Sequence, residues 1–94
     1  MDITKCITVS TAHVSEDTIG KLKQEPVTNK FCLAVYEKGE FGFWIYIPEY
    51  IWDMKHSLPE DLYRCMALAK EHNCEWLCLD RDGEEVAVLP TYDW

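Results

Sequence analysis

The chain has 94 residues, of which 48% are hydrophobic and 28% are charged, and its formal net charge is −8. That length supports one hydrophobic core, so we expect residues 1–94 to form a single domain and exclude a disordered or fibrous chain. Seventeen acids outnumber nine lysines and arginines. This balance argues against direct binding to nucleic acid or to an anionic membrane, because both require clustered positive charge.

We expect no targeting segment. The first residues lack the basic and apolar regions of a secretory leader, and no apolar run reaches the ~18 residues of a membrane span. Five cysteines at irregular spacing favour reduced thiols over a disulfide framework. We therefore expect a cytoplasmic protein. No phosphate-binding glycine motif occurs, so we also expect no cofactor.

The first predicted elements are a strand and a short helix. Residues 5–10 alternate between polar and apolar side chains, the pattern of a half-buried strand. Ser15 then stands at the position of a helix N-cap, and Glu16 and Asp17 follow in the first turn, where the helix dipole favours acids. We predict a helix over about 16–24.

A hairpin rich in aromatic residues is predicted next. Residues 31–36 and 43–47 are apolar and are joined by a glycine-containing loop. The period of two directs Trp44 and Tyr46 to the face opposite the one that carries the aliphatic side chains of the second strand. Residues 49–56 fit either a turn or a short irregular helix.

The clearest helix signal covers about 59–72. Apolar side chains recur there at the spacing of one helix face. Ser57 and Glu60 have the spacing of a capping box. Asn73 stands where the helix should end.

A second hairpin is predicted after this helix. Apolar runs at 76–79 and 85–89 flank an Asp-Gly turn at 80–83. The element order is then β-α-β-β-α-β-β. It predicts an α+β fold with a mostly antiparallel sheet of about five strands and two helices on one face. A parallel pairing of the first strand stays open, because each helix lies between two strands.

Ser10, Thr11 and His13 could supply a nucleophile and a base just after the first strand. No defined catalytic motif surrounds them. We therefore expect them to satisfy backbone groups at this junction, and we expect a protein without enzymatic activity. A small enzyme or small-ligand binder that uses His13 with Ser10 and Thr11 is the alternative.

The sequence also offers a weak metal-binding pattern in His72, Cys74 and Cys78. On a strand, residues four apart lie roughly 13 Å apart and cannot share one ion. We predict buried thiols and no metal site.

Six of the twelve aromatic residues fall within 41–52. Four of them, Trp44, Tyr46, Tyr50 and Trp52, are the predicted binding residues, since exposed Trp and Tyr are typical anchors of protein interfaces. They would be ordinary core residues if helices or a second copy of the chain covered them.

Negative charge is concentrated in the second half of the chain. Residues 49–94 carry eleven acids and four bases, a net −7, whereas residues 1–48 carry a net −1. The turn that follows 76–79 and its flank hold Asp80, Asp82, Glu84 and Glu85. These acids form either a solvated surface or an attractive site for a protein partner with a basic surface.

A resemblance to a known family covers nearly the whole chain. It rests on four segments: V-S-T-A-H at 9–13, G-F-W-I-Y-I-P at 42–48, C-E-W-L-C-L-D-R-D-G at 74–83 and L-P-T-Y-D-W at 89–94. They resemble a domain of unknown function in small acidic bacterial proteins from plasmids, integrative elements and prophages. No catalytic residue comes with this resemblance.

The resemblance implies a mobile-element context, in which small acidic proteins block host defence nucleases. We therefore expect a non-enzymatic protein-interaction module. Its most specific form is an anti-CRISPR or anti-restriction inhibitor of the DNA-mimic type. A homodimer with a self-complementary face around Trp44 and Tyr46 is a further interpretation.

Overall fold

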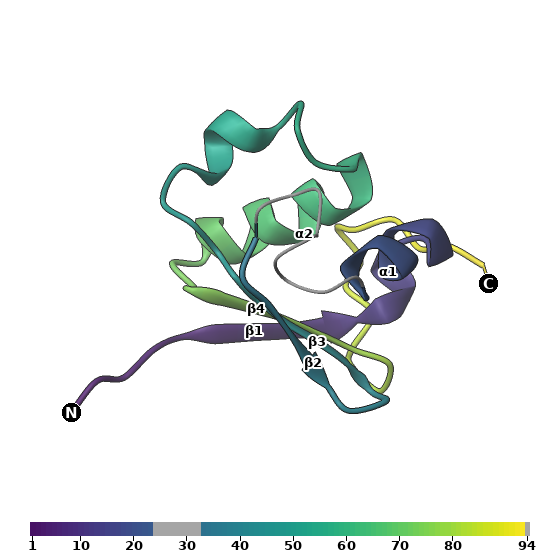
Figure 1. Ribbon diagram of the computed structural model, residues 1–94, viewed down its shortest axis with the longest axis horizontal. Coiled ribbons are helices and arrows are strands. Elements are labelled where there is room, and N and C mark those ends of the chain that lie inside the picture. The colour runs from purple at the N-terminus through teal and green to yellow at the C-terminus, as the bar shows by residue number, and fades with distance from the viewer. Residues whose placement is uncertain (24–32, 94) are drawn as a thin grey trace.

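The computed structural model describes residues 1–23 and 33–93 (Figure 1). In chain order its elements are β1 (Cys6–Ser10), the 3₁₀ helix η1 (Thr11–His13), α1 (Glu16–Leu22), β2 (Val35–Lys38), β3 (Gly42–Tyr46), the 3₁₀ helix η2 (Ile51–Met54), α2 (Glu60–Glu71) and β4 (Trp76–Asp80). The mixed α+β class is confirmed.

The described strands form one sheet in the order β1-β4-β3-β2. The sheet is mostly antiparallel, as predicted, because β3 runs opposite to both β2 and β4. The first strand is the exception: β1 runs parallel to β4, with Cys6 opposite Trp76 and Ser10 opposite Asp80. This parallel pairing is the arrangement that the sequence left open.

The predicted strand at 85–89 does not form, so the described sheet has four strands instead of about five. The predicted turn is present, since the Gly83 N–H donates to the Asp80 carbonyl at 2.9 Å. However, β4 already pairs with β1 on one side and β3 on the other. No edge of β4 is free for a hairpin partner, and the chain turns away instead.

The first hairpin is shifted from its predicted bounds. The paired part of its first strand is Val35–Lys38, and β3 starts at Gly42, which shortens the loop to three residues. Residues 31 and 32 of the predicted strand and residue 24 of the predicted helix lie outside the described residues. The ambiguous stretch 49–56 contains η2.

The helix ends are partly as predicted. The Ser15 hydroxyl accepts the Thr18 N–H at 3.2 Å and caps α1. The predicted capping box at α2 is wrong, because Pro59 occupies the N-cap position without a side-chain hydrogen bond. The end of α2 is confirmed: Asn73 has the left-handed φ of 59° that often terminates a helix.

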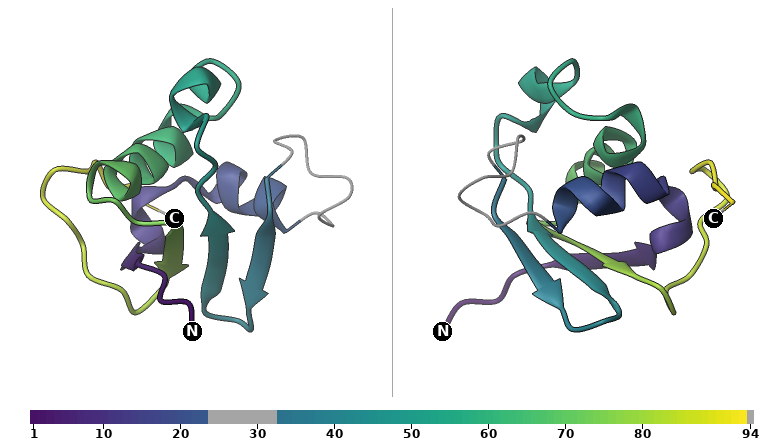
Figure 2. Two further views of the ribbon diagram at one scale, coloured as in Figure 1. Left: turned by 90° about the vertical axis from the view of Figure 1, so that its left-hand side faces the viewer. Right: turned by 45° about the vertical axis from the view of Figure 1, so that its right-hand side comes forward.

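The helices lie over one face of the sheet, as predicted (Figure 2). The strand side chains that point to this face are buried among the apolar side chains of the helices. They include Val9, Val35, Phe43, Ile45, Leu77 and Leu79. Residues that alternate with these point to the other face, which no described helix covers.

Within residues 1–23 and 33–93, no helix is long and apolar enough to cross a membrane.

Candidate functional site

The uncovered side of the sheet, named here the open face, carries four aromatic side chains. Strand register places Tyr36 opposite Trp44 and Tyr46 opposite Trp76. Tyr36 and Tyr46 are 58% and 40% exposed, whereas Trp44 and Trp76 are half-buried. The two aromatic residues that the sequence predicted on β3 therefore lie on a surface instead of in the core of this chain.

Contacts between the rings connect three members of this aromatic group. The ring of Trp76 lies 5.4 Å from that of Tyr46 in an edge-to-face contact and 6.0 Å from that of Tyr36. These are favourable separations for aromatic pairs. A shallow apolar hollow of about 290 Å³ opens between Tyr36, Trp44, Trp76 and Cys6. The open face thus offers fixed rings around a concave centre.

Sequence reasoning did not single out Trp76 as a member of this aromatic group. Its strand was predicted, and the period of two placed it on one face or the other. The missing information was strand order, because only the pairing of β4 with β3 brings Trp76 beside Tyr46.

A charged pair borders the aromatic group. The Lys38 Nζ lies 2.7 Å from an Asp80 carboxylate oxygen and 5.0 Å from the centre of the Trp44 ring. The hydrogen bond from Lys38 lowers the pKa of Asp80 below its usual value, with help from the Asp82 backbone N–H. Asp80 is therefore the predicted acid with the least freedom to attract a partner.

The other predicted acids are free of this constraint. Asp82, Glu84 and Glu85 are exposed after β4. The Glu84 carbonyl accepts the Ser10 N–H at 3.0 Å, which holds this acidic segment against the end of β1. The acids therefore extend from the Lys38–Asp80 end of the sheet.

Tyr50 and Trp52 do not join the open face. They are 59% and 48% exposed, at the turn before η2 and within it, and η2 lies on the helix side of the sheet (Figure 1). Tyr50 shares a separate hollow with Tyr46, Pro48 and neighbouring residues. Of the predicted set, Trp44 and Tyr46 lie on the open face, Tyr50 adjoins Tyr46 through this hollow, and Trp52 lies on η2.

Thiols also lie on the open face. Cys6 is exposed and Cys78 is buried between Thr8 and Trp44 in the sheet register. Desolvation raises the pKa of both thiols, and the Lys38 ammonium partly offsets this for Cys78. The four cysteines in the described ranges are free.

The alternative site around His13 is closed. His13 is 1% exposed. Its Nδ1 lies 2.9 Å from the Pro90 carbonyl, and its Nε2 accepts the Val86 N–H at 2.8 Å. These partners fix the proton on Nδ1 and leave neither ring nitrogen free to act as a base. The Ser10 hydroxyl accepts the Ala12 N–H at 3.0 Å and caps η1.

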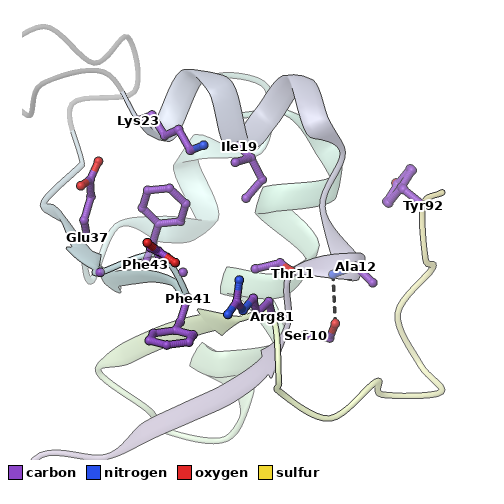
Figure 3. A pocket seen from close by; sticks show the side chains of 13 residues that line it. Ser10, Thr11, Ala12, Ile19, Lys23, Glu37, Phe41, Phe43, Arg81 and Tyr92 are labelled. Carbon is purple, nitrogen blue, oxygen red and sulfur yellow. Dashed lines mark hydrogen bonds between the residues drawn. The ribbon is translucent and has the colours of Figure 1, made fainter. Parts of the chain in front are cut away.

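Another concavity lies beside this junction, at the ends of β1 and β4 (Figure 3). Its volume is about 640 Å³. Ser10 and Thr11 line it, together with α1 and the β2–β3 loop, but His13 does not. The structure therefore brings two residues of the alternative site to a hollow and separates the third from it.

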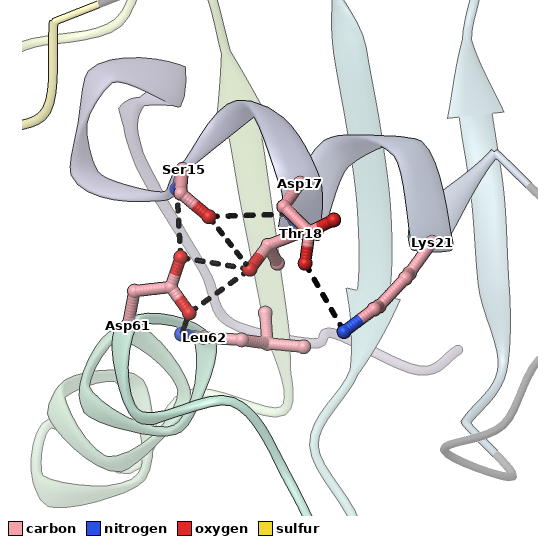
Figure 4. A network of polar contacts seen from close by, with 6 residues as sticks. All are labelled: Ser15, Asp17, Thr18, Lys21, Asp61 and Leu62. Carbon is pink, nitrogen blue, oxygen red and sulfur yellow. Dashed lines mark hydrogen bonds and ion pairs between the residues drawn. The ribbon is translucent and has the colours of Figure 1, made fainter.

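A buried polar cluster joins the starts of the two α-helices (Figure 4). The Asp61 carboxylate accepts the Ser15 N–H at 2.7 Å, the Thr18 hydroxyl at 2.8 Å and the Leu62 N–H at 2.8 Å. Its acceptor capacity is used by residues of this chain, so the cluster acts in helix packing. Within the described ranges, no group of three or more His, Cys, Asp or Glu side chains could hold a metal ion.

Comparison with protein families gives a match that covers most of the chain. Residues 6–94 match the model of the C-terminal domain of a family of unknown function, DUF5983. No curated protein and no solved structure matches the chain.

Proposed function

Because the chain belongs to the DUF5983 family, which brings no known activity, we propose from its own geometry that it is a non-enzymatic protein-interaction module. The observation that carries this proposal is the open face, where Tyr36, Trp44, Tyr46 and Trp76 form one aromatic surface. We propose further that the module acts in the cytoplasm and originates from mobile genetic elements, as the resemblance of its sequence implies.

The open face has the chemistry of an interface core. Trp and Tyr dominate binding hot spots because each buries a large area at a small cost in side-chain entropy. The contacts of Trp76 with Tyr36 and Tyr46 hold these rings in place before a partner arrives. Preordered rings lower the cost of binding further.

The closed state of His13 supports the non-enzymatic part of the proposal. Both of its ring nitrogens are engaged by the backbone of the C-terminal segment. Two residues of the alternative active site, His13 and Ser10, thus have structural roles that account for them.

Charge favours a partner with a basic surface. The net charge of −8 attracts such a partner at long range. Asp82, Glu84 and Glu85 are exposed beside the Lys38–Asp80 end of the sheet, where lysines and arginines at the rim of a partner's apolar patch could meet them. The aromatic rings would then supply affinity, and the acids would supply orientation and speed of association.

Affinity capture from the native host tests the interaction. The baits are the unmodified protein, a Tyr36→Ser and Tyr46→Ser double variant, and a Val88→Ser variant. Val88 is 73% exposed in the C-terminal segment and serves as the matched control. We expect one partner that the double variant loses and the control retains. Equal capture by all three baits would place the interaction elsewhere.

In its most specific form, the partner is a host defence nuclease and the protein is a DNA-mimic inhibitor. Support comes from the exposed acids and from the mobile-element context of the resemblance. The test is cleavage by purified restriction and CRISPR nucleases of the host at several salt concentrations. Inhibition should weaken steeply with salt and with neutralisation of Asp82, Glu84 and Glu85. Neutralising Asp80 should matter less, because Lys38 already occupies its carboxylate.

Self-association through the same open face is the competing outcome. Sedimentation at tens of micromolar distinguishes the two. A monomer supports binding to a different protein, whereas a dimer that Tyr36→Ser and Tyr46→Ser dissociate would replace that proposal with a self-complementary interface.

A further inference from the structure

The concavity at the ends of β1 and β4 is a second candidate site, separate from the open face. The two strands are adjacent and parallel, so their carboxyl ends meet at the same edge of the sheet. Crevices outside the carboxyl ends of parallel strands are common ligand sites. A volume of about 640 Å³ falls within the range of small-molecule pockets.

Charges of both signs line this hollow. Lys23 follows α1, Arg81 follows β4, and Glu37 and Glu40 come from β2 and the loop after it. Among the residues that the structure describes, none of these four side chains forms an ion pair with another. The hollow therefore presents two cationic and two anionic groups whose charges are not taken up by each other.

Arg81 is held in position by two contacts with Phe41. Its backbone N–H donates to the Phe41 carbonyl at 2.8 Å, and its guanidinium carbon lies 4.6 Å from the centre of the Phe41 ring. A guanidinium stacked on a ring keeps its N–H edge available for a carboxylate. In Figure 3 this guanidinium points into the hollow, toward the side where Ile19 and Phe43 lie.

Two buried apolar side chains also line the hollow. They are Ile19 and Phe43, which are only 7% and 4% exposed and lie between the charged groups. Thr11 adds a hydroxyl at the start of η1. A ligand that satisfies all these surfaces needs a carboxylate, an ammonium group and an apolar side chain.

We propose that this hollow binds a small peptide-like zwitterion with an apolar side chain. Arg81 and Lys23 bind its carboxylate, Glu37 and Glu40 bind its ammonium group, and Ile19 and Phe43 contact its side chain. This site is independent of the protein-binding role of the open face.

The test is a titration with the dipeptide L-phenylalanyl-L-leucine, in which binding is monitored through the backbone amide chemical shifts of the protein. Two blocked analogues serve as matched ligands: the C-terminal amide lacks the carboxylate, and the N-acetyl form lacks the ammonium group. We expect saturable shifts at Gly39, Gly42 and Arg81 for the zwitterion. Each blocked analogue should bind at least about tenfold more weakly, as loss of one charged contact implies.

Protein variants complete the design. Arg81→Gln should weaken the free dipeptide about tenfold and leave the amide nearly unaffected, because the amide has no carboxylate to lose. Glu37→Gln with Glu40→Gln should likewise weaken the free dipeptide about tenfold. It should leave the N-acetyl form nearly unaffected, because that form has no ammonium group to lose. Arg64→Gln, on the exposed side of α2, is the control. Equal binding of the three ligands, or no saturation at millimolar concentration, would overturn the proposal.

Discussion

Lys38 and Asp80 form an ion pair of 2.7 Å although β3 runs between their two strands. Gly42 of β3 is in register with both residues and has no side chain to separate them. The pair therefore joins the edge strand β2 directly to the central strand β4. It also fixes the Lys38 ammonium beside the Trp44 ring.

Replacing Lys38 with Met should change how the free energy of unfolding depends on pH. In the folded protein Lys38 holds the pKa of Asp80 below the ordinary 3.8. The pair thus stabilises the fold above pH 3.8, and this contribution is lost as pH falls through the lower, folded pKa. In urea unfolding between pH 2 and 6, the free energy of unfolding of Lys38→Met should fall less steeply with falling pH than that of the unmodified protein. Arg64→Met, which breaks the exposed Arg64–Glu60 pair, is the control and should leave the slope unchanged.

Gly42→Ala should destabilise the sheet by about 3 kcal/mol or more. A Cβ at this position would overlap the carbonyl oxygen of Leu79 on β4, so two paired strands would have to separate. Gly20→Ala is the control. Its Cβ meets no described atom within 4 Å, and it should stabilise α1 by about 0.5–1 kcal/mol. Equal unfolding free energies for the two variants would contradict the close approach of β3 and β4.

Asp61→Asn should lower the free energy of unfolding by about 1–3 kcal/mol. The Asp61 carboxylate accepts hydrogen bonds from the Ser15 N–H and the Thr18 hydroxyl, and the amide nitrogen of Asn would face one of these donors without accepting from it. Asp17→Asn removes only an exposed pair with Lys21 and should cost less than about 1 kcal/mol. Denaturant titration of both variants measures the difference, and a similar small cost for both would refute the packing role of Asp61.

His13→Ala should release the C-terminal segment. It removes the acceptor of the Val86 N–H and the partner of the Pro90 carbonyl, and it leaves a cavity. The expected cost is about 2–4 kcal/mol. Hydrogen exchange at Val86 and Tyr92 should accelerate more than exchange in the sheet, whereas the exposed His56 should tolerate Ala. Unchanged protection at Val86 would show that the segment is held by other contacts.

The cysteines should differ in their rate of alkylation according to their position in the fold. Burial raises the pKa of the Cys65 thiol to about 12, so almost no thiolate forms at pH 8. Cys6 is exposed and its pKa is raised too, yet reagents can reach it. Peptide mapping after iodoacetamide treatment of the native protein should show Cys6 modified well before Cys65. Reaction of Cys65 at the rate of Cys6 would mean that α2 opens readily.

Much of the fold could be predicted from local patterns. The helix at 60–71 and the cap at Ser15 depend on residues a few positions apart, and periodicity reports such relationships directly. The faces of β3 were also predictable, since alternation alone separates Trp44 and Tyr46 from Phe43 and Ile45.

The misassigned features depend on contacts between distant residues. The strand expected at 85–89 fails because β1 occupies the edge of β4 that it would need, and sequence alone does not give strand order. Without the strand order, the position of Trp76 beside Tyr46 could not be predicted either. The capping box at Ser57 is a local exception: Pro59, two residues later, takes the N-cap position. No local signal links the carboxylate of Asp61 to Ser15, forty-six residues earlier.

The parallel pairing of β1 with β4 also bears on how the chain is made. Cys6 finds its strand partner seventy positions later, at Trp76. During synthesis β1 therefore stays without its strand partner until β4 has left the ribosome. Contacts this remote in sequence slow folding. The hairpin of β2 and β3 can close early, but β4, the central strand that joins this hairpin to β1, is the last of the four strands to be made, so the sheet is completed only once β4 has emerged.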